Sequence, residues 1–300
     1  MPLKSLRFLL PLVAVAVAVA VACEPAAEPA EFADQVFDTV DATADTLPGD
    51  ATATGDPSTT MAGTWALATD WSACVAVADA RFELRSYKIL RVQIEQSGHQ
   101  LHETRTLCSA TSTQLLGQAT VFPTALLQAV GPLQVDATVI ASGASTAYES
   151  SAEIQLYGVK LNQPFADPMP DHAGDPQVFD TDGDGKPGAT LLIGKLCQIY
   201  VAIRAVSSLQ GMWVGPGRFE GAGLHDVDQI TLGGSSAFCE QAFPTYPNQP
   251  HSGFALQRVD QGGLDLDADK DGDVSCAEIV SAQAKIVTWK KADDSRCKGF

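Results

Sequence analysis

The chain has 300 residues, of which 45% are hydrophobic, and it carries a formal net charge of −17. This strong acidic excess argues against nucleic acid as a partner, because binding to phosphates requires a basic surface. The length suits one large core, since β domains of roughly 200–250 residues commonly fold as single units.

The N-terminal segment predicts export from the cytoplasm. Residues 1–22 carry Lys4 and Arg7, followed by an apolar run rich in Val and Ala. A charged start followed by such a run is typical of a signal peptide, and the run is short for a membrane-spanning helix. We therefore expect residues 1–22 to lie outside the fold.

The residues after the apolar run are Ala20-Val-Ala22-Cys23-Glu24. Small residues directly before a cysteine resemble the lipobox of bacterial lipoproteins, although Ala20 stands where that family usually has Leu. The resemblance implies a lipid on Cys23 and anchoring at the bacterial cell envelope, at the outer membrane or the cell surface. The alternative is ordinary cleavage near Ala22, which would leave Cys23 free.

Residues 23–60 predict an acidic linker. From Glu24 to Ala80 the chain has eleven acidic residues and no Lys or Arg. Low hydrophobicity and charge of a single sign keep such a segment extended and disordered. With a lipid on Cys23, this linker would hold the folded domain away from a membrane surface.

Six cysteines follow Cys23, and an even number in an exported chain predicts three disulfides. The sequence contains no CxxC pair, which argues against a zinc ribbon and against a redox motif. We expect cysteines that are neighbours in the sequence to pair. The expected bonds are Cys74–Cys108, Cys197–Cys239 and Cys276–Cys297.

Strand patterns dominate residues 61–300, which we expect to form one β-rich domain. Residues 90–95 alternate between apolar and polar, Ser97-Gly98 indicates a turn, and residues 101–108 return, so this region predicts a hairpin. Proline is favoured at the start of a helix, so Pro123 predicts one or two helical turns. Further strands are expected at 63–67, 74–78, 115–122, 133–141, 154–161, 197–205, 209–214, 229–232 and 254–259.

These elements predict a mainly β fold, either a barrel or a sandwich, with a short helix near the C-terminus. Tyr87–Arg91 followed by Gly98 resembles Tyr200–Arg204 followed by Gly211, which suggests two duplicated halves. Gly63-Thr-Trp65 also resembles the Gly-x-Trp opening of lipocalins. That resemblance implies a barrel that holds a small ligand.

Residues 162–188 predict a long loop with five prolines and an alternating acidic stretch. With Gly185 after it, the stretch resembles the short Asp-Gly calcium loops of exported proteins. Pro187 replaces the aliphatic residue of a full EF-hand, and Leu191 stands where the last carboxylate would be. The alternative is a plain Asp-Gly turn. The metal ligands that this resemblance implies are Asp180, Asp182 and Asp184.

Residues 267–278 carry carboxylates at positions 1, 3, 5, 7 and 12 of a twelve-residue loop, with Gly272 at position 6. A hard divalent cation needs about six to eight oxygens, and this spacing closely resembles the EF-hand calcium loop. The ligands implied for Ca²⁺ are the side chains of Asp267, Asp269 and Asp271, the backbone carbonyl of Asp273, a water-bridged Ser275 and both oxygens of Glu278.

The flanks of residues 267–278 fit the EF-hand family on one side only. Gly262-Gly263 opposes the entering helix of that family, whereas residues 276–287 have apolar residues near helical spacing. We therefore expect a weak, structural calcium site rather than a cytosolic type of sensor. The alternative is an acidic surface loop that binds no metal.

No catalytic residues are predicted. The sequence has neither a Gly-x-Ser-x-Gly elbow nor an HExxH helix. His99 and His102 would point to opposite faces of a strand, so they are not expected to share a metal. We expect an exported, lipid-anchored, calcium-binding β domain with a structural or interaction role. The alternatives are a small-ligand binding barrel and a hydrolase whose site is dispersed in the sequence.

Overall fold

The structure is a computed structural model, and it describes residues 60–77, 79–115, 117–142, 145–195, 197–237, 239–240 and 243–300. The chain divides into two compact units, Met1–Asp50 and Ala51–Phe300, and every described residue belongs to the second unit. The predicted signal peptide, the lipid-attachment residue Cys23 and the predicted linker up to residue 59 lie outside the described residues.

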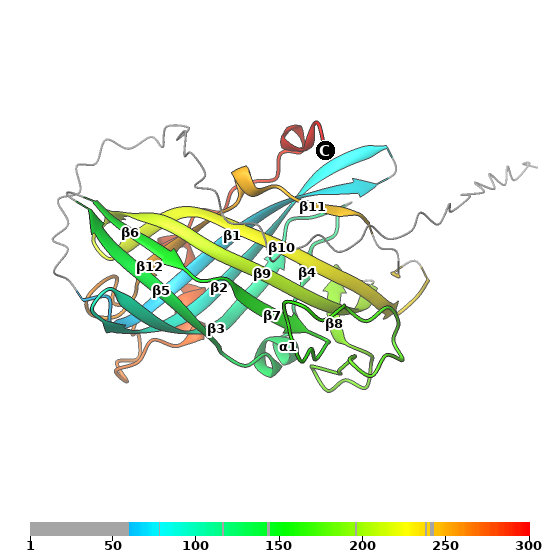
Figure 1. The fold of residues 1–300 in the computed structure, drawn as a ribbon, viewed down its shortest axis with the longest axis horizontal. Helices are drawn as coiled ribbons and strands as arrows, with labels where there is room; N and C mark the ends of the chain where they lie inside the picture. Colours follow the sequence, from blue (N-terminus) through cyan, green and yellow to red (C-terminus); the bar gives the residue numbers. More distant parts are fainter. Residues whose placement is uncertain are drawn as a thin grey trace, which may run out of the picture. The chain divides into compact units, whose positions relative to one another are not determined.

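The predicted fold class is confirmed, because the second unit is built on one antiparallel sheet (Figure 1). Eight of its strands pair in a closed ring in the order β1-β2-β3-β5-β6-β9-β10-β12, and β12 returns to β1. The strands of the ring are β1 (Gly63–Val77), β2 (Ala80–Ser97), β3 (Gln100–Ser112), β5 (Leu133–Ser142), β6 (Ser145–Ser150), β9 (Cys197–Gly215), β10 (Arg218–Gly234) and β12 (Gly253–Arg258).

Shorter elements complete the wall of the ring. The strand β4 (Thr120–Val121) pairs with β3 and β8 (Ala189–Ile193), and β8 pairs with β9, so a second bridge joins β3 to β9. The helix α1 (Thr124–Ala129) follows Pro123 as predicted and buries Leu126 against the core. The remaining short elements are β7 (Glu153–Tyr157), β11 (Thr245–Pro247) and the 3-10 turn η1 (Gln249–His251).

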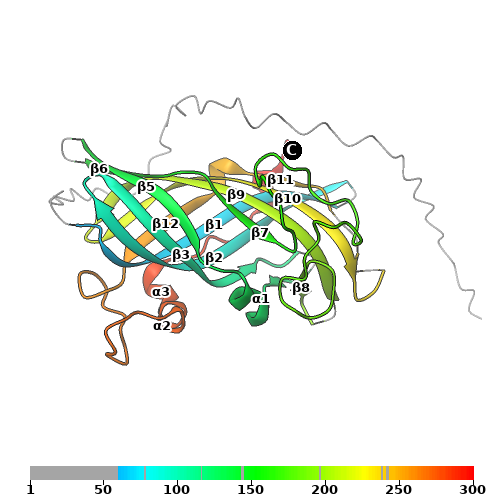
Figure 2. The same cartoon turned by 60° about the horizontal axis from the view of Figure 1, so that its bottom comes forward.

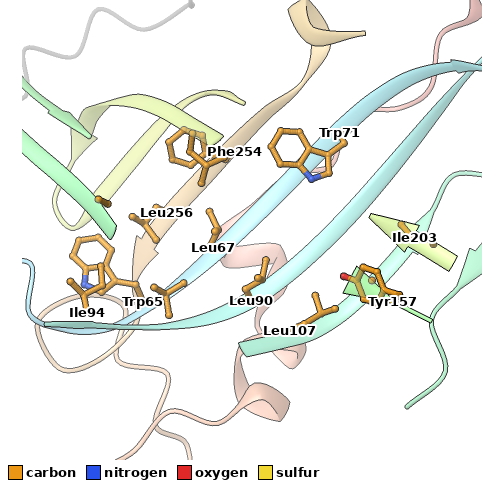
Figure 3. Close-up of a cluster of buried hydrophobic side chains, with 14 of the residues drawn as sticks. Trp65, Leu67, Trp71, Leu90, Ile94, Leu107, Tyr157, Ile203, Phe254 and Leu256 are labelled. Atoms are coloured by element: carbon orange, nitrogen blue, oxygen red, sulfur yellow. The ribbon is translucent and has the colours of Figure 1, made fainter. Parts of the chain in front are cut away.

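The inner face of the ring holds the main hydrophobic core (Figure 3). Trp65, Leu67 and Trp71 project inward from β1, because residues two apart in a strand share one face. Glycines on the neighbouring strands make room for aromatic rings. A Cβ atom at Gly223 would lie 2.2 Å from the Trp71 ring, and one at Gly211 would lie 2.6 Å from the Phe254 ring. Gly211 of β9 and Gly223 of β10 therefore serve the packing of the core.

The outer face of β1 and β2 is covered by the C-terminal segment, residues 259–300. Ala66, Ala68 and Ile89 on the strands form a second buried cluster with apolar residues of this segment. Those residues are Val259, Leu266, Val274, Ile279 and Ile286. The predicted C-terminal helix is present as two short pieces, α2 (Cys276–Ser281) and α3 (Gln283–Ile286), which lie outside the ring (Figure 2). The 3-10 turn η2 (Asp294–Cys297) follows them.

Three disulfides are present, as predicted, but two of the predicted pairings are wrong. Cys197–Cys239 forms as expected. The other bonds are Cys74–Cys297 and Cys108–Cys276, in place of Cys74–Cys108 and Cys276–Cys297. The reason is that residues 259–300 fold back across β1 to β3, which brings the C-terminal cysteines to the first strands. Three disulfides indicate an oxidising, non-cytoplasmic location.

Several predicted strand boundaries differ from the structure. The strands expected at 63–67 and 74–78 form the single long strand β1, and those expected at 197–205 and 209–214 form β9. Most of the strand expected at 115–122 is absent, because Gly117 has a positive φ of 80° and only β4 remains. Within the described residues, no helix has the length and apolarity needed to cross a membrane.

The two segments that suggested duplication have different local structures. Gly98 lies in the turn of the predicted hairpin between β2 and β3, which the structure confirms. Gly211 lies inside β9, where it pairs with Gly221 of β10. The sequence similarity therefore does not extend to a shared turn.

Candidate metal centre

The C-terminal acidic loop, residues 267–278, brings its first three aspartates together. One carboxylate oxygen from each of Asp267, Asp269 and Asp271 lies within 4.8 Å of the other two. Before the loop, β12 ends at Arg258 and a tight turn follows, so the entering helix of an EF-hand is absent from this segment, as predicted. The conformation of the loop itself therefore brings the three carboxylates together.

Two left-handed residues curl this loop. Lys270 has a φ of 60°, and Gly272 has a φ of 91°. At Gly272 this conformation has no steric cost, because glycine lacks a Cβ atom. The Gly272 amide donates to Asp267 Oδ2 at 3.0 Å, and the Asp273 amide donates to Asp271 Oδ1 at 2.9 Å. These hydrogen bonds hold the carboxylates on the inside of the curl.

One oxygen of this cluster has no protein partner. Asp267 Oδ1 is buried and accepts no hydrogen bond within the described part of the chain. A buried, unpaired carboxylate oxygen is costly, and the cost is removed when the oxygen coordinates a cation. The position of the Asp267 carboxylate beside two further carboxylates therefore favours a role as a metal ligand.

The predicted ligand Glu278 lies at the closure of the loop and is not part of the three-aspartate cluster. Its Oε1 accepts from the Ala268 amide at 2.7 Å, and its Oε2 accepts from the Ser275 amide and from Ser275 Oγ, each at 2.8 Å. Ser275 in turn caps α2, which gives a capping box. These hydrogen bonds, led by that from the Ser275 amide, lower the pKa of Glu278 to about 2. Coordination by Glu278 and Ser275 remains a prediction.

The second half of the loop is fixed to the ring. The Asp273 carboxylate pairs with Arg91 of β2, and coordination by the Asp273 backbone carbonyl stays a prediction. Arg91 Nε also donates to the Val274 carbonyl at 2.7 Å, and the Val274 side chain is buried in the second cluster. Cys276 adds a covalent bond to Cys108. Arg91 was not predicted to contact this loop, because nothing local in β2 distinguishes it from a solvent-facing arginine.

The acidic loop at residues 180–188 has the same local design. Asp180, Asp182 and Asp184 each place one carboxylate oxygen within 4.8 Å of the other two. The Gly185 amide donates to Asp180 Oδ2 at 2.9 Å, which is the same first-to-sixth hydrogen bond as in the C-terminal loop. Two segments far apart in the sequence therefore arrange three aspartates in a similar way.

Thr190 anchors two of these aspartates. Its amide donates to Asp182 Oδ2 at 3.2 Å, and its hydroxyl donates to Asp184 Oδ2 at 2.7 Å. Asp182 Oδ1 is buried and has no hydrogen-bond partner among the described residues. Burial raises the pKa of Asp182, and the nearby charges of Asp184 and Asp180 add to the effect. A bound cation would counteract both effects and lower the pKa of Asp182, because it favours the ionised carboxylate.

Two glycines allow the 180–188 loop to lie directly against the sheet. A Cβ atom at Gly158 would lie 2.1 Å from the Val201 carbonyl oxygen, and one at Gly188 would lie 2.4 Å from the same atom. The Gly158 amide donates to Thr181 Oγ1 at 2.8 Å. The loop is thus docked on β9.

Both loops offer oxygen ligands only. Carboxylate and carbonyl oxygens suit hard cations, and the flexible coordination of Ca²⁺ fits a curled loop better than the strict octahedron of Mg²⁺. No family model, curated protein or solved structure matches the chain. The interpretation of the two loops therefore depends on their own chemistry and geometry.

Proposed function

We propose that this protein is an exported, lipid-anchored β domain whose two acidic loops bind Ca²⁺ in a structural or interaction role. One shared observation supports the proposal. Each loop brings three aspartates together, and one of the three has a buried carboxylate oxygen with no hydrogen-bond partner among the described residues. In this account Ca²⁺ holds each loop against the ring, and the lipid holds the domain at the membrane.

The energetic role of the cation follows from charge. Five carboxylates lie between Asp267 and Glu278, with Lys270 as the single basic residue, so the metal-free loop repels itself. Calcium that binds only the native state stabilises it by about 2.7 kcal/mol at a hundredfold excess over the dissociation constant. Extracellular modules often bind at roughly 10⁻⁴–10⁻³ M, and the absent entering helix points to that weak end.

Calcium titration of the purified protein by calorimetry is expected to give two ions per chain. Asp267→Asn should remove the C-terminal site, because this residue supplies the buried unpaired oxygen, and should leave one ion per chain. Asp180→Asn should remove the other site. Asp136→Asn is the matched control, since this exposed aspartate lies on β5 outside both loops. Equal stoichiometry in all four proteins would refute the assignment of the sites.

The lipid anchor is tested at Cys23. A Cys23→Ser variant cannot be acylated, so we expect it to leave the membrane fraction and appear in the soluble fraction. Anchoring depends on the buried acyl chains, which contribute about 0.8 kcal/mol per CH₂ group. Cell fractionation with immunoblotting measures the change. If Cys23→Ser stays in the membrane fraction as the wild type does, the lipoprotein interpretation is wrong.

A further inference from the structure

The inner face of the ring carries a group of polar residues that neither acidic loop uses. Thr69 of β1 lies opposite Lys88 of β2 and opposite Phe254 of β12 in the strand register. Directly opposed residues in an antiparallel pair share a face, so these three side chains all point into the ring. Leu67 and Trp71 flank Thr69 on the same face of β1.

Lys88 has no ion-pair partner within the described residues. Its Nζ donates to Gln155 Oε1 at 2.8 Å, and Tyr157 also donates to that oxygen, at 2.5 Å. Burial lowers the pKa of Lys88, and the more distant charge of Glu153 counteracts it in part. An ammonium group has three N–H donors, so two donors of Lys88 have no protein acceptor.

Glu153, whose charge acts on Lys88, is already used by Arg105, as is Glu103. Arg105 Nε donates to Glu103 at 2.8 Å, and its Nη1 donates to Glu153 at 2.7 Å. Glu153 accepts a further hydrogen bond from Ser207 Oγ at 2.9 Å. Among the described residues, Lys88 therefore has no direct counter-ion, although the interior holds these two glutamates.

Two more buried atoms near Lys88 lack partners. Thr69 is 4% exposed and His225 is 7% exposed, yet neither Thr69 Oγ1 nor His225 Nδ1 has a hydrogen bond within the described residues. The His225 ring stacks on Trp71 with 4.8 Å between the ring centroids. Burial lowers the pKa of His225 to about 4; Gln249 opposes this effect, and the charge of Lys88 adds to it. At neutral pH this imidazole is uncharged and has one donor and one acceptor nitrogen.

Lys88 is only partly buried. Lys88 points inward but retains accessible surface, and so does Ser86, which is the next inward residue of β2 toward the β1–β2 hairpin. Leu90, two residues in the other direction, is fully buried in the core. Along β2, the inward-facing residues therefore change from fully buried at Leu90 to partly exposed at Lys88 and Ser86.

We propose that Thr69, Lys88 and His225 form a binding site for a small molecule that carries a single carboxylate. The carboxylate of the ligand supplies the counter-charge that Lys88 lacks, and the positive ammonium group excludes a cation from the site. The Thr69 hydroxyl and the His225 imidazole supply further hydrogen bonds to the ligand carboxylate. Burying a carboxylate without such hydrogen bonds is costly. Trp71, beside Phe254, offers an apolar wall for the carbon skeleton of the ligand. This proposal does not depend on calcium.

The test is a titration of the calcium-loaded protein with hexanoate and, separately, with hexanol, followed by tryptophan fluorescence and calorimetry. Trp71 reports on the site because it stacks on His225. Hexanoate is expected to bind at least tenfold more tightly than hexanol. Lys88→Met should remove this preference, and Thr69→Val should weaken hexanoate binding severalfold. Lys195→Met is the matched control, since this exposed lysine lies between β8 and β9.

Two results would overturn the proposal. The first is equal affinity of the wild type for hexanoate and hexanol, or no binding of either up to about 10 mM, which would assign buried water to the unpartnered atoms. The second is a hexanoate preference that survives in Lys88→Met. NMR of the histidine rings in the wild type makes the test independent of any variant's folding. Hexanoate should shift the His225 signals and leave those of the exposed His99 unchanged.

Discussion

Replacing Cys74 and Cys297 together by alanine is expected to lower the free energy of unfolding by about 3–5 kcal/mol. This disulfide joins residues with a sequence separation of 223, so its removal releases a very large loop in the unfolded chain. It also frees the end of the C-terminal segment from β1. Urea denaturation under non-reducing conditions measures the change, and tryptophan fluorescence reports Trp289, which contacts Tyr87.

The control for this prediction is the double variant Cys197→Ala/Cys239→Ala. That bond spans a separation of only 42 residues, so the loop-entropy relation predicts a loss smaller by about 1–1.5 kcal/mol. Limited proteolysis should cut residues 259–300 faster in the Cys74/Cys297 variant than in the control. A larger loss in the control, with residues 259–300 still protected in both, would contradict the role of this segment.

Arg85→Met is expected to destabilise the domain by about 3–5 kcal/mol, because it leaves buried carboxylates without their partner. The Arg85 side chain is fully buried and binds Asp70 Oδ1 at 2.7 Å and Glu83 Oε1 at 2.6 Å. Arg218→Met is the control, since the Arg218–Glu220 pair is partly exposed and should cost about 1 kcal/mol or less. Thermal and urea unfolding measure both variants.

The pH dependence of the stability shows whether Arg85 acts through its charge or through packing alone. Burial opposes the ionisation of Glu83, but hydrogen bonds from Ser72 and Asp293 and the charges of Arg85 and Arg296 outweigh it, so the pKa is lowered. A lowered carboxyl pKa contributes stability above the ordinary value of 4.5, and this contribution is lost as the pH falls below it.

The stability difference between wild type and Arg85→Met should therefore shrink on acidification from about pH 6 to about pH 3. Glu83→Gln added to Arg85→Met should recover part of the lost stability, because it removes a buried charge. A difference that stays constant over this pH range would show that Arg85 acts through packing alone.

Local sequence patterns predicted the elements whose signal lies within one segment. The hairpin of β2 and β3 has alternating residues and a Ser97-Gly98 turn, and the short helix α1 follows Pro123. β6 was not predicted, since Ser145–Ser150 is polar and Tyr148 is its single large apolar residue. β8 was also missed, because the adjacent 180–188 loop obscured its short apolar run.

Two of the three cysteine pairs could not be predicted from local sequence patterns. Pairing of sequence neighbours assumes that nearby residues stay together, but residues 259–300 fold over the outer face of β1 and β2. The apolar residues of β1 on both faces, Ala66 and Ala68 outside and Trp65 and Leu67 inside, already indicate that both faces are covered. They do not indicate which segment covers the outer face.

The clustering of the aspartates in each loop was predictable, because loop spacing alone brings them together. The residues that position the two loops come from other elements or other parts of the fold, as Arg91 does for the C-terminal loop and Thr190 for the 180–188 loop. Their polar side chains resemble many surface residues of strands. The polar group around Lys88 was equally hidden, since it forms only when β1, β2 and β10 meet.

The central claim, that calcium stabilises this domain, is tested most directly by thermal unfolding with millimolar Ca²⁺ and with chelator. At about 10 mM Ca²⁺ and dissociation constants of roughly 10⁻³–10⁻⁴ M, each site contributes about 1.4–2.7 kcal/mol. We therefore expect chelation to lower the melting temperature of the wild type by about 6–20 °C, since each kcal/mol shifts a domain of this size by about 2–4 °C. In chelator, Asp267→Asn should be at least as stable as the wild type, because it removes one repelling charge, and Ca²⁺ should stabilise it less. Identical melting curves for the wild type with Ca²⁺ and with chelator would contradict the claim for both loops.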